Sequence, residues 1–158
     1  MKIAYFKTRC FVCWKGFEIA QLTDSAYGKF LFIDYKNREF RYFNWFENGE
    51  IEKVVKLVLA DNEKLQIEND NTKGNTAIKL VGLLADADFE PIFGYVKCPR
   101  CSTRFHSFPN NKTRIGEISE LTFEKISRFS EKNKIEYLKN EIKTRYNKRC
   151  TTNWLPAD

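Results

Sequence analysis

Two cysteine pairs, each with the spacing CxxC, constrain the fold of this chain more than any other feature. The first pair is Cys10 and Cys13, and the second, Cys98 and Cys101, follows after 84 intervening residues. Together they supply the four thiolates of a tetrahedral structural zinc site. Both pairs follow an apolar and basic run, and a phenylalanine comes four residues after each pair. We therefore predict two β-hairpins that share one zinc ion.

The residues around the cysteines favour a metal site. A CxxC turn aims two sulfurs at one ion, and Pro99 suits the second turn because its ring fixes φ. A zinc ion bound by four thiolates carries a net negative charge, which nearby cations offset. Six basic residues flank the two pairs: Lys7, Arg9, Lys15, Lys97, Arg100 and Arg104.

At the level of these motifs, the segments 3–22 and 92–108 resemble the zinc ribbons and the broader rubredoxin-like group. The resemblance covers about a quarter of the chain and rests on the four cysteines, Phe17 and Phe105. It implies that the cysteines hold zinc, or iron as in the electron carriers of that group. It also implies that the hairpins serve as platforms for nucleic acid or protein.

Two features depart from the pattern of that group. The 84 residues between the pairs exceed the common ~15–20. Trp14 and Ser102 follow the second cysteine of each pair, where many such hairpins have glycine. The long separation is physically acceptable because loop-closure entropy grows only with the logarithm of loop length. It predicts a packed insertion tied at its base by the ion. Three alternatives stay open for the cysteines: simple packing, dithiol redox chemistry and an iron centre.

The length and the 42% hydrophobic content suffice for one domain with a real core, which we expect to be α+β. The domain would span 1–158, with zinc-ribbon-like halves 1–22 and 92–110, a β-rich insertion 23–91 and a C-terminal helical part 117–149. Apolar and aromatic runs predict strands at 3–6, 17–22, 29–35, 39–46, 92–97 and 104–108.

Helices are predicted where apolar residues recur with helical spacing. Ile51, Val54, Val55 and Val58 indicate a helix, although apolar residues off this stripe leave a strand open. Two C-terminal helices are expected. Ser119 or Thr122 would cap the first, which carries Leu121, Ile126 and Phe129, and Ser130 would cap the second, which carries Ile135, Leu138, Ile142 and Tyr146.

The rest of the insertion gives weaker signals. Segment 64–68 is an expected strand, 69–74 an expected polar turn and 86–91 an expected loop. Segment 76–84 is apolar and stays undecided between strand and helix.

Residues 27–46 form the most aromatic stretch, with nine aromatic side chains in twenty residues. Aromatics interleaved with Lys29, Lys36, Arg38 and Arg41 are able to stack bases and contact phosphates. However, they occur on both faces of each predicted strand, which favours burial on both sides. We therefore interpret this hairpin as core.

The single histidine, His106, excludes several zinc enzymes. A thermolysin-like hydrolase needs His-Glu-x-x-His, and a zinc deaminase needs a histidine ahead of its CxxC. A site filled by four cysteines is closed, whereas a catalytic zinc keeps an open position. We expect a structural zinc, no catalytic residues, a surface or half-buried role for His106 and an ordinary thiol at Cys150.

The excess of positive charge lies in the last third of the chain. The net charge is +6, and residues 97–158 carry 14 basic and 7 acidic side chains. This bias favours acidic partners, nucleic acid first among them. The candidate contacts are Lys139, Lys143, Arg145, Lys148 and Arg149, although a solvated amphipathic helix explains the same residues.

These observations predict a non-catalytic, zinc-binding interaction protein. A protein-binding module, such as an inhibitor or assembly subunit, is the alternative. A metal-dependent enzyme that uses Asp86, Asp88 and Glu90 comes third. No membrane partner or small-molecule substrate is inferred.

The start of the sequence has no long apolar segment typical of a secretory signal, and no apolar window approaches the ~20 residues of a spanning helix. We therefore expect a cytoplasmic protein, where a reducing environment favours metal-bound cysteines over disulfides.

Overall fold

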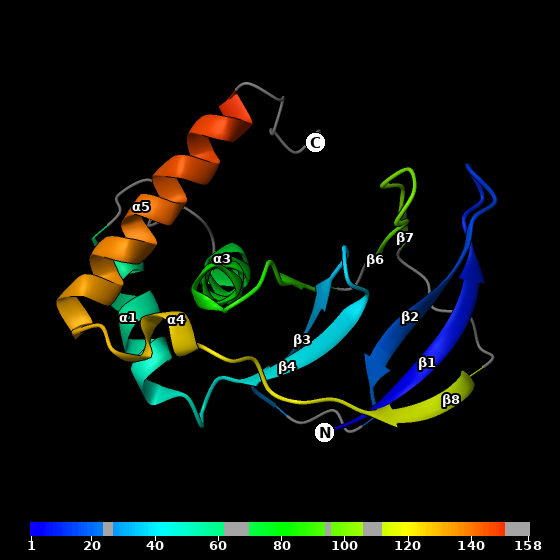
Figure 1. Cartoon of the computed structure of the whole chain (residues 1–158), viewed down its shortest axis with the longest axis horizontal. Coiled ribbons are helices and arrows are strands. Elements are labelled where there is room, and N and C mark those ends of the chain that lie inside the picture. The colour runs from blue at the N-terminus through cyan, green and yellow to red at the C-terminus, as the bar shows by residue number, and fades with distance from the viewer. Residues whose placement is uncertain (24–26, 62–69, 94–95, 106–111, 151–158) are drawn as a thin grey trace.

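A computed structural model describes residues 1–23, 27–61, 70–93, 96–105 and 112–150. Within these ranges, nothing is described for the side chains of 70–73, 105 and 145–150. The described chain is α+β, with two three-stranded antiparallel sheets, a two-stranded hairpin and four helices. Figure 1 shows how these elements are arranged.

The first sheet has the strand order β2-β1-β8. Strands β1 (Lys2–Arg9) and β2 (Gly16–Leu22) form an antiparallel hairpin, as predicted, with the first cysteine pair in its connection. The third strand, β8 (Lys112–Glu117), pairs with the other edge of β1. This strand was not predicted from the sequence.

The second sheet has the order β4-β3-β5. Its strands are β3 (Lys29–Asp34), β4 (Glu39–Asn44) and the two-residue β5 (Glu90–Pro91). The turn between β3 and β4 is fixed by the Asp34 carboxylate, which accepts hydrogen bonds from the backbone N–H groups of Lys36 and Asn37 at 2.8 and 3.2 Å.

Four described helices complete the fold: α1 (Gly49–Ala60), α3 (Asp70–Leu84), α4 (Glu124–Ser127) and α5 (Glu131–Cys150). The helical prediction around residues 51–58 is confirmed, because Ile51, Val54, Val55 and Val58 are all buried in α1. Ser130 caps α5 as predicted, since its hydroxyl accepts the Asn133 N–H at 3.3 Å.

The second sheet is the middle layer of the molecule, with the helices on one face and the first sheet on the other (Figure 1). Phe32 and Phe43 pack into the helical core. Leu31, Ile33 and Phe40 pack towards the first sheet. This two-sided burial confirms that the aromatic hairpin is mainly core.

The insertion 23–91 is not β-rich as predicted, because helices α1 and α3 contain more of its residues than its strands do. The expected polar turn at 69–74 is also wrong, since α3 begins at Asp70. Burial of Ile78, Val81 and Leu84 in the helical core outweighs the weak helix propensity at the start of this segment. The expected strand 64–68 lies outside the described residues.

The first C-terminal helix is shorter than predicted. Helix α4 has only four residues, so Leu121 precedes it and Phe129 follows it. Leu121 instead donates its backbone N–H to Tyr42 O at 2.8 Å. The predicted caps Ser119 and Thr122 do not occupy the N-cap position, which is Phe123. In the described chain, no helix combines the length and the apolar character that crossing a membrane requires.

Candidate metal centre

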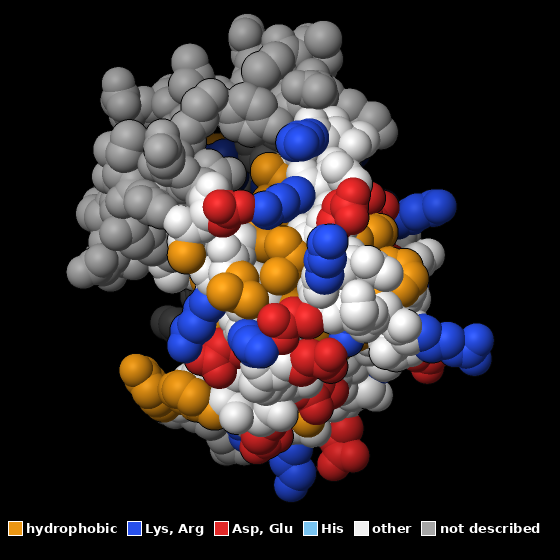
Figure 2. Space-filling view, turned by 90° about the vertical axis from the view of Figure 1, so that its left-hand side faces the viewer, with side chains coloured by type: hydrophobic (Ala, Val, Ile, Leu, Met, Phe, Trp, Pro, Cys, Tyr) orange, Lys and Arg blue, Asp and Glu red, His pale blue; other side chains and the backbone are white. Residues whose placement is uncertain are grey.

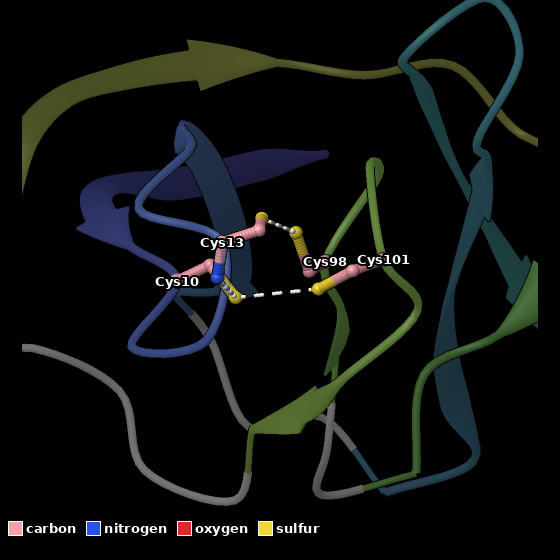
Figure 3. A group of neighbouring side chains, drawn as sticks. All are labelled: Cys10, Cys13, Cys98 and Cys101. Carbon is pink, nitrogen blue, oxygen red and sulfur yellow. Dashed lines mark hydrogen bonds between the residues drawn. The ribbon is translucent and has the colours of Figure 1, made fainter.

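Two β-hairpins bring the four cysteines together. Cys10 and Cys13 lie in the connection between β1 and β2. Cys98 and Cys101 lie between β6 (Val96–Lys97) and β7 (Arg104–Phe105). Figure 3 shows the two connections facing each other, with all four side chains directed into the space between them.

The two connections have the same backbone hydrogen bonds. In the first, the Cys10 N–H donates to Lys15 O at 2.9 Å, and the Trp14 N–H donates to Cys10 O at 2.9 Å. The same two bonds recur in the second, from Cys98 to Thr103 O at 2.8 Å and from Ser102 to Cys98 O at 2.9 Å. The similarity noted between the two sequence segments is therefore also a similarity of conformation.

Trp14 and Ser102 both have φ of 59°, in the left-handed region. This region normally favours glycine, because a Cβ atom crowds the backbone there. Both hairpins therefore have a backbone conformation that usually favours glycine at this position, although neither has glycine there.

The sulfur atoms have the separations of a metal site. Sγ of Cys10 lies 3.5 Å from Sγ of Cys101, and Sγ of Cys13 lies 3.5 Å from Sγ of Cys98. All four lie within 4.8 Å of one another. A tetrahedral zinc with Zn–S bonds of about 2.3 Å places its sulfurs about 3.8 Å apart, whereas a disulfide requires about 2.05 Å. The arrangement fits one shared ion rather than disulfides.

Hydrogen-bond donors stabilise negative charge on these sulfurs. The backbone N–H of Cys13 donates to Sγ of Cys10 at 3.4 Å. The backbone N–H of Arg100 donates to Sγ of Cys98, also at 3.4 Å. The Thr103 hydroxyl lies 3.1 Å from Sγ of Cys101. Thr103 was not among the predicted site residues, although a hydroxyl two positions after a CxxC pair is visible in the sequence.

The thiols differ in acidity. The Thr103 hydroxyl and backbone N–H lower the pKa of Cys101 to about 6. The Lys15 backbone N–H acts to lower the pKa of Cys13, but burial and the neighbouring thiols raise that pKa to about 12. Four thiols in such close contact do not all ionise without a cation. A bound divalent ion would supply the positive charge that stabilises four thiolates, and it would displace the thiol protons.

Of the five basic residues predicted to contact nucleic acid, the structure describes the side chains of two, Lys139 and Lys143. Lys139 is paired with Asp61, while Lys143 is exposed. Lys134, on the same helix, is buried and paired with Glu50. Figure 2 shows basic and acidic side chains interspersed over the helical face. The side chains of Arg145, Lys148 and Arg149 lie outside the described residues.

The acidic loop has structural contacts. Both carboxylate oxygens of Asp86 accept backbone N–H groups of α4, from Glu124 at 2.9 Å and Lys125 at 2.8 Å. Glu90 is paired with Lys97 at 2.6 Å. Within the described ranges, the four cysteines are the one group of three or more potential metal ligands. His106 and the Cys150 side chain fall outside the description.

The fold and the cysteine cluster define an α+β protein with a four-thiolate site compatible with zinc. Comparison with known proteins gives no match to a family model, a curated protein or a solved structure.

Proposed function

We propose that Cys10, Cys13, Cys98 and Cys101 hold one zinc ion whose role is structural. The observation that supports this proposal is that the four sulfur atoms lie close together. Each of the two 3.5 Å sulfur–sulfur contacts joins a cysteine of one hairpin to a cysteine of the other. An all-thiolate donor set suits zinc, and four protein ligands leave no open position for a substrate. The ion would join the first sheet to the second hairpin, in a zinc-ribbon-like unit interrupted by the long insertion.

The protein as a whole acts, in this proposal, as a non-catalytic interaction protein inside the cell. Nucleic acid is the favoured partner, through the basic C-terminal third that includes Lys139, Lys143, Arg145, Lys148 and Arg149. The excess of positive charge in residues 97–158 supports it. Reversing the charge of Lys143 together with Arg145 should weaken binding, and binding should fall steeply with salt.

Two other functions make different predictions. A protein-binding module would associate with its partner in a salt-tolerant manner, centred on exposed aromatic residues. An enzyme using the acidic loop would show divalent-dependent activity that disappears in Asp88→Ala while the fold stays intact.

Native mass spectrometry of untagged protein purified from cells tests the zinc proposal directly. We expect a mass increase of one zinc ion per chain, lost in the Cys98→Ser variant but retained in Ser107→Ala, which changes a residue outside the CxxC pairs. A red protein with one iron per chain would assign the site to iron, because the same four thiolates bind both metals. A metal-free chain would overturn the proposal.

A further inference from the structure

A cavity of about 360 Å³ lies where the first sheet, the second sheet and the second cysteine hairpin meet. Four of its lining residues are buried apolar or aromatic side chains: Tyr5, Ile33, Phe40 and Val96. Cavities of this size and character are typical of small-ligand sites. An apolar floor with aromatic rings suits a planar, uncharged ring.

Basic and acidic side chains line the rest of this cavity: Arg38, Arg41, Lys97 and Arg114, together with Glu18, Glu39 and Glu117. Arg114 is held over the Tyr5 ring, with its guanidinium carbon 3.5 Å from the ring centroid, and bonds Glu18 at 3.0 Å. Lys97 and Arg41 also line the cavity, each paired with a glutamate. Arg38 lines it as well, is exposed, and has no ion-pair partner in the described parts of the chain.

The positive charge continues outside the cavity along both cysteine hairpins. Residues 7–17 and 96–105 together contain six basic residues and no aspartate or glutamate. Four of the six are exposed and have no ion-pair partner among the residues described: Lys7, Arg9, Lys15 and Arg100. Lys97 and Pro99 belong to the second hairpin and also line the cavity, so the basic surface begins at its wall.

Exposed aromatic side chains accompany these cations. Phe11 is 66% exposed and Trp14 is 71% exposed, both in the first cysteine connection. Exposed aromatics beside unpaired cations form the usual surface for unpaired bases and their phosphates.

We propose that this face binds single-stranded nucleic acid, with one unpaired base in the cavity and the neighbouring phosphates on the hairpin cations. A small ligand would need only the cavity, whereas the unpaired cations beyond it suit an extended polyanion. A base within a duplex is stacked and paired and does not enter such a cavity without being extruded. The inference rests on the proposed zinc, because the ion holds the hairpin that supplies one cavity wall.

Fluorescence anisotropy on the zinc-loaded full chain tests the role of the base. The probes are three labelled oligonucleotides of equal length: a twelve-residue thymidine strand, the same strand with every base removed, and a duplex. We expect the thymidine strand to bind roughly tenfold or more tightly than the other two, since each stacked base contributes appreciably. Equal binding of the abasic strand would overturn the base-binding cavity, and tighter duplex binding would overturn single-strand recognition.

Substitutions test the two parts of the surface separately. The double variant Lys15→Ala and Arg100→Ala should weaken thymidine-strand binding and reduce its salt dependence. The matched control, Lys56→Ala with Lys79→Ala, removes two exposed cations of helices α1 and α3, outside both the cysteine hairpins and the basic C-terminal third, and should change neither. Ser119 is exposed and lines the cavity, so Ser119→Trp should block entry of the base, whereas Ser119→Ala should not.

Zinc content measured on the same samples separates this inference from the proposed function. One zinc per chain without oligonucleotide binding would overturn the nucleic-acid site and leave the metal site standing. If the chain holds one zinc and binds an acidic protein but no oligonucleotide, the surface belongs to a protein partner, and this outcome would also overturn the inference. An unchanged circular dichroism spectrum of Ser119→Trp would exclude misfolding as the cause of lost binding. The comparison with the abasic strand uses the unaltered protein and does not depend on any variant.

Discussion

At the residue scale, the left-handed residues after each cysteine pair show how the site tolerates the absence of glycine. Trp14 and Ser102 share a φ of 59° and the same hydrogen-bond pattern. A non-glycine residue in this conformation costs roughly 1–2 kcal/mol. The surrounding bonds and, in our proposal, the ion hold the backbone there regardless of the side chain.

Replacing Ser102 by glycine should therefore stabilise the zinc-loaded protein. We expect a gain of about 0.5 kcal/mol, because relief of backbone crowding exceeds the larger entropy that glycine loses on folding. Guanidinium unfolding at constant zinc concentration measures it. Ser102→Ala is the matched control and should give no gain, because alanine keeps the Cβ atom. An equal gain in both variants would show that the serine hydroxyl, and not the backbone, causes the effect.

The buried turn residue Asp34 gives a prediction for pH. Burial acts to raise its pKa, but hydrogen bonds from Asn37 and from the Lys36 backbone lower that pKa overall. A carboxylate with a lowered folded-state pKa stabilises the fold above its unfolded pKa of about 3.9, and this contribution disappears as the pH falls through the folded value.

Asp34→Asn should consequently lower the free energy of unfolding by roughly 1–2 kcal/mol at pH 7, since charge-assisted hydrogen bonds are lost. The difference from the wild type should shrink as the pH falls below about 4. Urea unfolding of both proteins across this pH range measures the difference. A difference that is independent of pH would mean that the carboxylate charge does not contribute.

Single residues were the most predictable part of the site. The CxxC spacing identified the four cysteines that the structure brings together, because a CxxC turn places two sulfurs side by side. Thr103 was missed because a hydroxyl contact to sulfur has no spacing rule of its own. The sequence shows that Lys134 and Lys139 are charged. It does not reveal their ion pairs, because the partners Glu50 and Asp61 lie far away in the sequence.

At the element scale, Asp86 links the end of α3 to the start of α4. Its carboxylate accepts two backbone N–H groups at the first turn of α4, which has no side-chain cap of its own. This long-range cap explains why α4 begins at Glu124 and not at the predicted caps Ser119 or Thr122.

Asp86→Ala should destabilise the protein by about 1–2 kcal/mol, the usual effect of losing a helix cap. Asp86→Asn keeps an oxygen acceptor and should lose less. Thermal unfolding ranks the two variants. If Asp86→Ala left stability unchanged but abolished a divalent-dependent reaction, the acidic loop would be catalytic instead.

Two elements were missed or mistaken because tertiary contacts decide them. Strand β8 is mostly exposed and lacks apolar alternation, so its pairing with β1 comes from its partner and not from its own pattern. Helix α3 contains Gly82, which weakens helix propensity. A Cβ atom there would lie 2.4 Å from Phe89 O, so glycine permits a close packing that no local rule reveals.

At the scale of the whole molecule, the cysteine centre joins parts that are distant in the sequence. The two close sulfur contacts link residues 91 and 85 positions apart. The helical core contains no residue of the two cysteine hairpins, whereas the smaller core includes Ile3, Tyr5 and Ala20 of the first sheet. The layers should therefore respond unequally if the proposed ion is removed.

Removing zinc with a chelator should lower the melting temperature by roughly 10 °C, because a cross-link over such a long loop restricts the unfolded chain strongly. Hydrogen exchange followed by mass spectrometry should show faster exchange in β1, β2 and the second hairpin, with α1 and α3 still protected. Restoring zinc should reverse both effects. Faster exchange throughout the chain would contradict this division.

The wide separation of the two cysteine pairs also has a consequence during synthesis. At about 5–20 residues per second, a ribosome completes the first pair several seconds before the second. In that interval the strands and helices between them emerge and begin to fold, while Cys10 and Cys13 wait as an incomplete half-site. Capture of the proposed zinc by all four cysteines therefore waits until Cys101 has been made, whereas strand β8 and helices α4 and α5 are still to follow.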